Sequence, residues 1–196
     1  MMATAIILCV AAYLVGSIPT GLYVARARGV DLRSVGSGNI GATNVARALG
    51  RGFAIAVLIA DALKGFLPVF IGRHCLKQLS PAAVALAGLA AIVGHMFTIF
   101  LRGRGGKGVA TSLGVALAIS PLAALCGFGL YMLAYVTTRI SSIGSLLGIW
   151  SFPLFAWLLG GVDRAYVALS LGTAALVTIR HRANLQRLWR GEEKRA

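Results

Sequence analysis

Two stretches, AIILCVAAYLV over residues 5–15 and AAVALAGLAAIV over residues 82–93, decide the fold class of this chain. Both are continuously apolar, without the alternation that strands of a membrane barrel require. The whole chain is 58% hydrophobic and 12% charged, with a mean hydropathy of +0.84. A soluble domain of 196 residues cannot bury so much apolar surface, whereas lipid can cover it if the backbone bonds to itself. The sequence predicts an all-α integral membrane protein with a single domain over residues 1–196.

The order of the apolar stretches predicts the topology. Spans are expected over about 2–25, 52–72, 81–101, 143–159 and 165–179, and the first is expected to be retained because no basic residue precedes Arg26. The stretch 109–136 suits either one tilted helix or two short helices broken at Ser120–Pro121. The broken form puts 15 of the 19 Lys and Arg residues on one side, in segments 26–51, 102–107, 139 and 180–195. Basic loops stay in the cytoplasm, so we predict about seven short transmembrane helices, with the N-terminus outside and the C-terminus cytoplasmic.

The charge and the reactive residues exclude several classes of protein. A net charge of +14 would suggest nucleic acid in a soluble protein, but here the positive-inside rule explains most of it, and no nucleic-acid partner is expected. No metal or other cofactor is predicted, because the five acidic residues form no cluster that could hold magnesium or a metal pair. This argues against Asp-rich, metal-dependent phosphatidyltransferases. The His-x4-Asp signature of other acyltransferases is also absent, and the three cysteines lack paired spacing.

The first polar segment follows the first span and reads SGNIGATNVAR over residues 37–47. Its glycines allow backbone N–H groups to converge, and a helix that begins here would turn its positive end toward an anion. Side-chain donors and a phosphate-binding guanidinium would come from Ser37, Asn39, Thr43, Asn44 and Arg47. The alternative is a helix start with Ser or Asn as its cap, but a cap needs only one such residue.

The second polar segment is a basic, glycine-rich loop made of Gly103, Arg104, Gly105, Gly106, Lys107 and Gly108. It has the composition of a phosphate-binding loop but not the Walker A pattern, because Leu101 and Gly108 stand where Gly and Ser or Thr are needed. The alternative is a flexible turn, for which so many glycines would be costly. We favour anion binding. The nearby His95 fits a packing role as well as a site role.

The third polar segment is the tail from Arg180 to Trp189, in which His181 and Asn184 share a helix face. Taken alone, it fits an amphipathic helix lying on anionic lipid equally well. Ser141 and Ser142 are expected near the same side, where they could cap a helix or bind a ligand. Asp61 and Lys64, three residues apart inside a span, can pair, and the sequence leaves a functional and a structural role open.

These segments carry a resemblance to a known family. The stretches GSIPTGLYVARARGVDLRSVGSGNIGATNVAR (16–47), GHMFTIFLRGRGGKGVAT (94–111) and RHRANLQRLWRGEE (180–193), in this order, closely resemble the bacterial acyl-phosphate:glycerol-3-phosphate acyltransferases, the PlsY family. The resemblance covers nearly the whole chain. It implies a multi-pass enzyme of the bacterial cytoplasmic (inner) membrane that acylates the 1-hydroxyl of glycerol 3-phosphate in the first acylation step of phospholipid synthesis. The donor would be acyl phosphate, and the products lysophosphatidic acid and phosphate.

The resemblance also implies roles for particular residues. Essential Ser and Arg correspond to Ser37 and Arg47, and the loop from Gly103 to Gly108, with Lys107 as its cation, would bind glycerol 3-phosphate. A catalytic His and Asn correspond to His181 and Asn184, and a structural Glu to Glu193. Relatives often have Glu where this chain has Ala183, which weakens any role for a carboxylate beside His181. The partners implied are glycerol 3-phosphate, acyl phosphate and membrane lipids. A transient contact with the soluble enzyme that makes acyl phosphate is compatible with the resemblance.

The mechanism expected from these residues is direct transfer without a metal. Cations and N–H groups would hold two phosphates together, so proximity would supply most of the rate. His181 could act as a base, but we favour a hydrogen bond to substrate because Arg180 and Arg182 beside it should lower its basicity. A covalent acyl-enzyme on Ser37 is not required. The rival function is an organophosphate transporter, which should show internal repeats and polar midplane helices that this sequence lacks. A lipid-binding structural protein would leave both glycine-rich segments unexplained.

Overall fold

The computed structural model describes residues 1–195, and within that range the chain forms helices and loops without any strand. In chain order the helices are α1 (Met2–Ser17), α2 (Thr20–Arg26), α3 (Ala42–Leu49), α4 (Arg51–His74), α5 (Pro81–Met96), the 3₁₀ turn η1 (Ile99–Leu101), α6 (Val109–Ile119), α7 (Pro121–Thr138), α8 (Ser141–Leu158), α9 (Arg164–Arg180) and α10 (Arg182–Trp189). The predicted all-α class is confirmed.

Among residues 1–195, five stretches are long and apolar enough to cross a membrane: Met2–Arg26, Arg51–His74, Pro81–Leu101, Pro121–Thr138 and Ser141–Leu158. The apolar helix α6 has 11 residues and α9 has 17, so both are shorter than these. The protein is therefore built as a multi-pass membrane protein. The count of seven spans and the side on which each terminus lies stay predictions.

Prolines break two of the predicted apolar stretches. The stretch 109–136 is divided at Ser120, where α6 ends and Pro121 begins α7, as the hairpin alternative predicted. The first span was predicted without a break and is interrupted at Ile18–Pro19, between α1 and α2. Proline has no N–H and restricts the residue before it, so it begins a helix more easily than it continues one.

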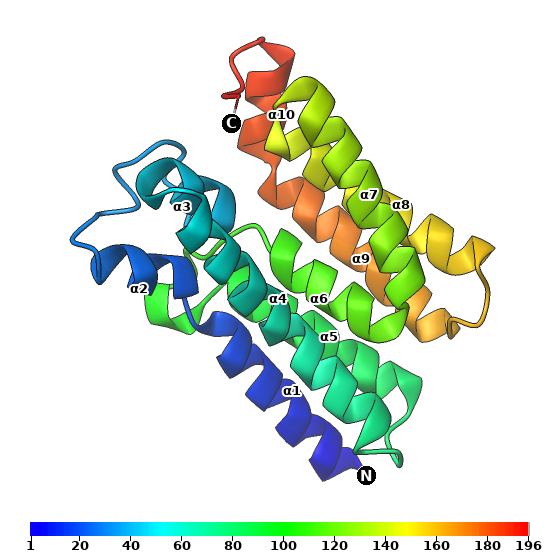
Figure 1. The fold of residues 1–196 in the computed structure, drawn as a ribbon. Coiled ribbons are helices and arrows are strands. Elements are labelled where there is room, and N and C mark those ends of the chain that lie inside the picture. The colour runs from blue at the N-terminus through cyan, green and yellow to red at the C-terminus, as the bar shows by residue number, and fades with distance from the viewer. Residues whose placement is uncertain (196) are drawn as a thin grey trace.

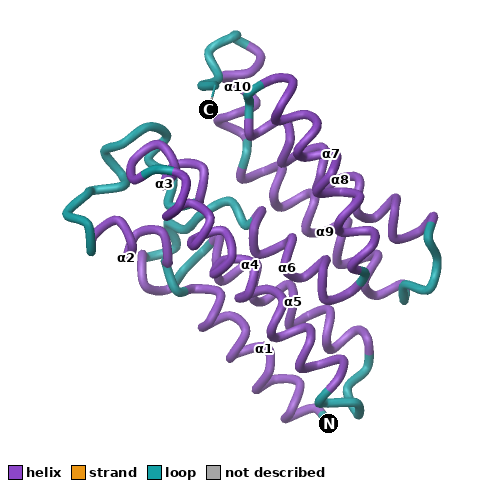
Figure 2. The backbone as a smooth tube through the Cα atoms, viewed as in Figure 1, coloured by secondary structure: helices purple, strands orange, loops and turns teal. Residues whose placement is uncertain are grey.

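Small residues let the helices pack closely in pairs. The tightest contacts join α1 to α5, α4 to α6 and α7 to α8, whose paths can be followed in Figure 2. A Cβ at Gly16 would overlap the backbone of Ala91, and one at Gly65 would overlap the backbone of Thr111. Close backbone approach through glycine is the usual way in which helices associate in lipid.

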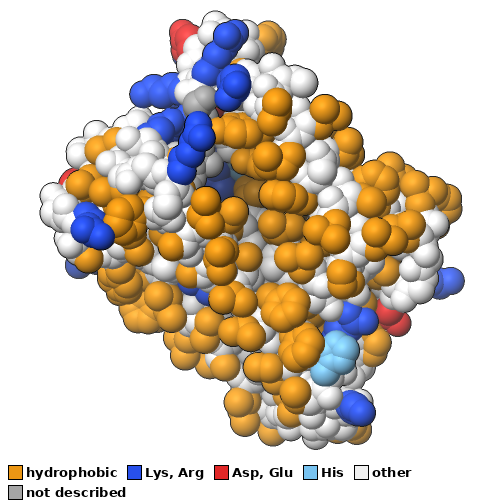
Figure 3. Space-filling view, in the orientation of Figure 1, with side chains coloured by type: hydrophobic (Ala, Val, Ile, Leu, Met, Phe, Trp, Pro, Cys, Tyr) orange, Lys and Arg blue, Asp and Glu red, His pale blue; other side chains and the backbone are white. Residues whose placement is uncertain are grey.

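The chain ends and loops separate into two groups at opposite ends of the bundle. Figure 1 shows the N-terminus at one end, and the segments around α2, α3 and α10 with the C-terminus at the other. In Figure 3, Lys and Arg side chains gather mainly at the second end, while hydrophobic side chains cover much of the visible face. We call this second end the basic end; α7 returns to it from the break at Ser120 (Figure 1).

Candidate functional site

A cavity of about 430 Å³ runs from the basic end into the bundle. Its polar mouth is lined by Ser37, Asn39, Thr43, Asn44, Arg47, Lys107, Gly108, Ser141, Ser142, His181 and Asn184, which joins residues from all three predicted polar segments. Its deeper wall is apolar and includes Leu113, Ala116, Ile119, Ala124, Phe152 and Leu169. Of the predicted site residues, the structure leaves Gly103, Arg104, Gly105 and Gly106 outside this lining.

Asn44 holds the first polar segment in shape. Its Oδ1 accepts a hydrogen bond from Ser37 N–H at 3.0 Å, and its Nδ2 donates to the carbonyl oxygens of Leu32 and Val35, both at 3.0 Å. The side chain is 1% exposed, so these bonds occupy its polar atoms. Asn44 therefore positions Ser37 and Arg47, which lie on either side of it in the sequence, at the cavity mouth.

The glycines of the second segment serve close packing. The N–H groups of Gly105 and Gly106 donate to the carbonyls of Met96 and His95, and a Cβ at Gly106 would overlap the His95 ring. Arg180 then donates to the carbonyl oxygens of Gly105 and Gly106 at 3.0 Å. Because the N–H groups of Gly105 and Gly106 are already used, this part of the loop cannot cradle an anion as the sequence suggested. Its packing instead positions Lys107 and the start of α6.

Lys107 is the cation that the loop presents to the cavity. Burial, aided by the guanidinium groups of Arg187, Arg47 and Arg180 and partly opposed by Glu193, lowers the pKa of its ammonium group to about 8. Within residues 1–195, its Nζ makes no hydrogen bond or salt bridge. A buried ammonium among other cations is stabilised by an anionic ligand.

Four helices begin at the cavity mouth. Residues at the N-terminal ends of α3, α6, α8 and α10 line it, among them Thr43, Gly108, Ser141 and Asn184. The first turn of a helix has N–H groups without helical acceptors and carries a partial positive charge. Four such ends around one space would favour an anion there, an arrangement that the separate motifs did not reveal.

His181 is fixed as a neutral ring. Its Nδ1 lies 2.8 Å from the carbonyl oxygen of Val177, so Nδ1 carries the proton and donates, while Nε2 is left as an acceptor. Burial lowers the pKa of His181 to about 4, and the charge of Lys107 contributes to the decrease. The low basicity of His181 was expected from the neighbouring Arg180 and Arg182, but burial and the charge of Lys107 are its main causes.

Glu193 joins the C-terminal tail to the mouth of the cavity. Its carboxylate accepts hydrogen bonds from Asn184, from Ser142 at 3.0 Å and from Arg187 at 2.7 Å. Burial alone would raise the pKa of this carboxyl, but the three hydrogen bonds outweigh burial and hold the pKa below its usual range. The next residue, Lys194, donates to the carbonyl of Gly36 at 3.2 Å and so ties the tail to the first polar segment.

Ser141 and Thr43 link two of the helix starts. Their hydroxyl oxygens lie 3.1 Å apart, and the Tyr131 hydroxyl lies 3.4 Å from Ser141. Within the first polar segment, Asn39 Oδ1 accepts a hydrogen bond from Gly41 N–H at 2.9 Å, which forms a local turn before α3. Ser141 and Asn39 therefore have structural partners as well as places in the cavity lining.

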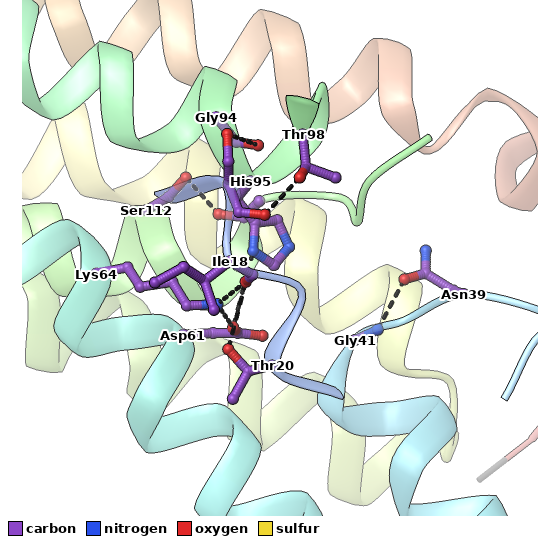
Figure 4. A network of polar contacts seen from close by, with 12 residues as sticks. Ile18, Thr20, Asn39, Gly41, Asp61, Lys64, Gly94, His95, Thr98 and Ser112 are labelled. Atoms are coloured by element: carbon purple, nitrogen blue, oxygen red, sulfur yellow. Dashed lines mark hydrogen bonds and ion pairs between the residues drawn. The ribbon is translucent and has the colours of Figure 1, made fainter. Parts of the chain in front are cut away.

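Asp61 and Lys64 form a buried pair below the mouth (Figure 4). Lys64 Nζ donates to Asp61 and also to the carbonyl oxygen of Ile18 at 2.6 Å, at the break between α1 and α2. His95 Nδ1 lies 3.9 Å from Asp61, and the His95 ring supports Gly106. Lys64 thus provides a hydrogen bond for a carbonyl that the broken first span leaves free, which gives the pair a structural role. Asp61 and His95 also line the cavity.

Sequence reasoning omitted two cavity-lining cations and several cavity-lining hydroxyl groups from the predicted site, among them Thr173. Arg187 and Lys194 line the mouth, and Thr173 lines the cavity with its buried Oγ1 lacking a hydrogen-bond partner within the described chain. The spacing of Arg187, three residues beyond Asn184, could have indicated it, since such residues share a helix face. Nothing in the sequence distinguishes Thr173 from other threonines within helices.

Comparison with known proteins gives a consistent result. The family model described as glycerol-3-phosphate acyltransferase matches residues 6–191. The glycerol-3-phosphate acyltransferases of Geobacter sulfurreducens and Anaeromyxobacter sp. (strain Fw109-5) are each 49% identical to the chain, over 97% of it and over 96% and 95% of their own lengths. Two crystal structures of PlsY (YgiH), an integral membrane glycerol 3-phosphate acyltransferase, are similar throughout. The glycerol 3-phosphate form has a TM-score of 0.94 at 41% identity, covering 98% of this chain and 96% of that one. The lysophosphatidic acid form has a TM-score of 0.92 at 40% identity, covering 98% and 95%.

Proposed function

The chain belongs to the glycerol-3-phosphate acyltransferase family, and on this premise we propose that it transfers a fatty acyl group from acyl phosphate to the 1-hydroxyl of glycerol 3-phosphate. The products are lysophosphatidic acid and inorganic phosphate. The reaction proceeds by direct transfer and uses no metal. The enzyme lies in the bacterial inner membrane with its basic end in the cytoplasm, where soluble glycerol 3-phosphate and the soluble enzyme that makes acyl phosphate meet it.

One observation carries this proposal: a single cavity has an anion-binding mouth and an apolar interior. Both substrates carry phosphate, and one of them also carries a long hydrocarbon chain. The four helix starts, together with Arg47, Lys107 and Arg187, suit two phosphate groups. The apolar wall between α6, α7, α8 and α9 suits the acyl chain, so both reactants fit one continuous space.

The catalytic advantage comes from holding two like-charged reactants together. Lys107 and the surrounding guanidinium groups offset the repulsion between the phosphates, and the converging N–H groups stabilise negative charge that develops on the acyl carbonyl oxygen. The glycerol hydroxyl oxygen attacks the acyl carbon, and the bond from that carbon to the phosphate oxygen breaks. The departing phosphate takes the hydroxyl proton, so no external base is needed.

His181 orients the attacking hydroxyl in this scheme. Its Nε2 is the free acceptor, because Nδ1 donates to Val177, and a hydroxyl group can donate to it. A pKa of about 4 makes the imidazole a weak base, which favours orientation over proton abstraction. Asn184 donates a hydrogen bond from Nδ2 to Glu193, which holds its amide group at the cavity mouth, where it helps to position the substrate.

A covalent acyl-enzyme is the alternative chemical route. It would require Ser37 to lose its hydroxyl proton to a nearby base. The Ser37 hydroxyl oxygen accepts a hydrogen bond from Asn39 N–H at 3.4 Å, and His181, whose pKa is about 4, is a weak base even though its Nε2 is free. We therefore assign Ser37 to phosphate binding. Detection of acylated protein after a pulse with donor alone would refute direct transfer.

The test is an assay with purified protein in detergent. Palmitoyl phosphate and labelled glycerol 3-phosphate, in buffer containing a metal chelator, should give labelled lysophosphatidic acid, and palmitoyl-CoA should not replace the donor. Arg47→Ala and Lys107→Ala should each lower kcat/KM by about a hundredfold, as loss of a charged ligand in a desolvated site does. Lys77→Ala, which removes an exposed lysine far from the mouth, is the matched control and should retain activity.

The competing function is transport of an organophosphate. A transporter would move labelled glycerol 3-phosphate into liposomes without forming lipid product, and its uptake would not depend on acyl phosphate. Absence of product from folded protein, together with such uptake, would replace the acyltransferase proposal.

A further inference from the structure

The apolar end of the cavity lies next to a second, smaller cleft. Besides the cavity, the structure has a surface cleft of about 250 Å³ at the opposite end of the bundle, lined by Arg73, Lys77, Asp163, Tyr166 and neighbouring residues. Within residues 1–195, only Ile119 borders both the cavity and this cleft. Ile119 is 6% exposed and so lies buried between the apolar interior and this cleft, at the end of α6.

Arg73 fixes the position of the end of α6. Its Nη1 donates to the carbonyl oxygens of Ala118 and Ile119, the second at 2.6 Å, and its guanidinium lies over the Tyr166 ring at 5.5 Å. These carbonyls belong to the last turn of α6, where helical donors are lacking and a cation is favoured. The backbone at the end of α6 is therefore anchored, and with it the position of the Ile119 Cα from which the side chain extends.

The distance from the mouth to Ile119 matches a fatty acyl chain. Along α6, the cavity lining extends from Gly108 at the mouth to Ile119, which at the helical rise per residue is about 16 Å. A fully extended chain of tetrahedral atoms advances about 1.2 Å per bond, so this length holds about 13 to 14 carbons. Ala124, Phe152 and Leu169, from three further helices, also line the apolar part of the cavity.

We infer that Ile119 sets the length of the acyl chain that the enzyme accepts, with Arg73 as the residue that positions it. The terminal methyl group of a chain bound from the mouth reaches Ile119, and longer chains must bend or stop short of the reacting position. This inference rests on the proposed function, because it assumes that the acyl donor occupies the cavity. It goes beyond that function by naming the residue that determines which donor reacts.

The experiment measures kcat/KM for a series of saturated acyl phosphates of about 10 to about 20 carbons, at saturating glycerol 3-phosphate. Ile119→Ala shortens the side chain by about two bonds, so the preferred acyl chain should become about two carbons longer. The ratio of kcat/KM for this longer donor to kcat/KM for the donor that the wild type prefers should be about tenfold higher in the variant than in the wild type. Ile119→Phe should shorten the preferred length by one or two carbons and leave short donors reactive. Ile119→Val should give a smaller increase and serves if the alanine variant folds poorly.

The matched control is Val69→Ala. Val69 is fully buried in the same apolar cluster but does not line the cavity, so this change loosens the core without moving the end wall. Its length profile should equal that of the wild type, whatever its total activity. Arg73→Met should broaden the profile toward longer chains, because the end of α6 is no longer anchored.

The outcomes separate the two proposals. Unchanged length profiles in Ile119→Ala, Ile119→Val and Ile119→Phe, while the wild type turns over acyl phosphate, would overturn the inference and leave the proposed function standing. A shift in Val69→Ala equal to that in Ile119→Ala would overturn it as well, because general loosening would then explain the change. Lack of turnover by folded wild-type enzyme with every acyl phosphate would instead refute the proposed function, and the inference with it.

Discussion

The charge of Lys107 should control the pH dependence of the reaction. Burial and neighbouring cations lower the pKa of this ammonium group from 10.5 to about 8, which places its titration in an accessible range. The protonated form is the one that binds phosphate. In the free enzyme, Lys107 is therefore about 90% protonated at pH 7 and about 10% protonated at pH 9, so kcat/KM should fall about tenfold across this interval.

Saturation with substrates should weaken this dependence. Two bound phosphates surround the ammonium group with negative charge, which raises its pKa in the complex and keeps the proton on Lys107. The maximal rate should therefore change much less than kcat/KM between pH 7 and pH 9. If kcat instead falls as steeply as kcat/KM between pH 7 and pH 9, a second group titrates in the enzyme–substrate complex.

Lys107→Arg is the variant that isolates the cause. A guanidinium stays protonated throughout this range, so the normalised kcat/KM profile should become flat even if the absolute rate falls because the geometry differs. Lys77→Arg, a change at an exposed lysine outside the cavity, should keep the wild-type profile. Initial rates with palmitoyl phosphate in detergent, over pH 6 to pH 10, provide the data. An equal decline in wild type and Lys107→Arg would refute the assignment.

Three further predictions concern other parts of the site. His181→Gln should lower kcat by less than about tenfold, since its amide can still accept a hydrogen bond; a decrease of about a hundredfold or more would instead identify a general base. Gly106→Ala should abolish most activity, because its Cβ would overlap the His95 ring, whereas Gly172→Ala, with open space around it, should be nearly silent in the same assay. Glu193→Ala should lower the free energy of unfolding by about 2 kcal/mol, because three hydrogen bonds to a buried carboxylate are lost. Glu192→Ala, at an exposed position, should leave it unchanged, and equal melting temperatures for the two variants would contradict this prediction.

The fold class and the break at Ser120 followed directly from the sequence, because apolar runs, a proline and the distribution of basic residues are all properties of the linear chain. The break at Ile18 was not predicted. A proline near the end of an apolar stretch interrupts the helix only if the carbonyls that it frees find another donor, and here Lys64 supplies one from a distant part of the chain. The buried pair of Lys64 with Asp61 has its structural explanation in that contact.

For the site as well, some features could be predicted from the sequence and others depend on tertiary contacts. The motifs identified the residues at the mouth, because donors and cations at glycine-rich helix starts are visible in the sequence. The prediction that the whole loop binds phosphate did not anticipate that His95 and Met96 accept the N–H groups of Gly105 and Gly106. That use depends on how the loop folds back on α5, which composition alone does not specify. The role of Glu193 as a shared acceptor likewise depends on tertiary contacts.

Helix α6 connects the two ends of the cavity physically. Its first turn, next to Lys107, lines the cavity mouth proposed to hold the phosphates, and its last residue, Ile119, lines the apolar part proposed to hold the end of the acyl chain. Close contacts of Gly65 with Thr111 and of Gly114 with Ala62 hold α6 against α4, and Arg73 holds its final carbonyls. A helix restrained along its length keeps a nearly constant distance between the reacting atoms and the end wall. Selectivity for chain length then follows from the number of residues in α6, and a side chain at position 119 can adjust it without altering the anion-binding mouth.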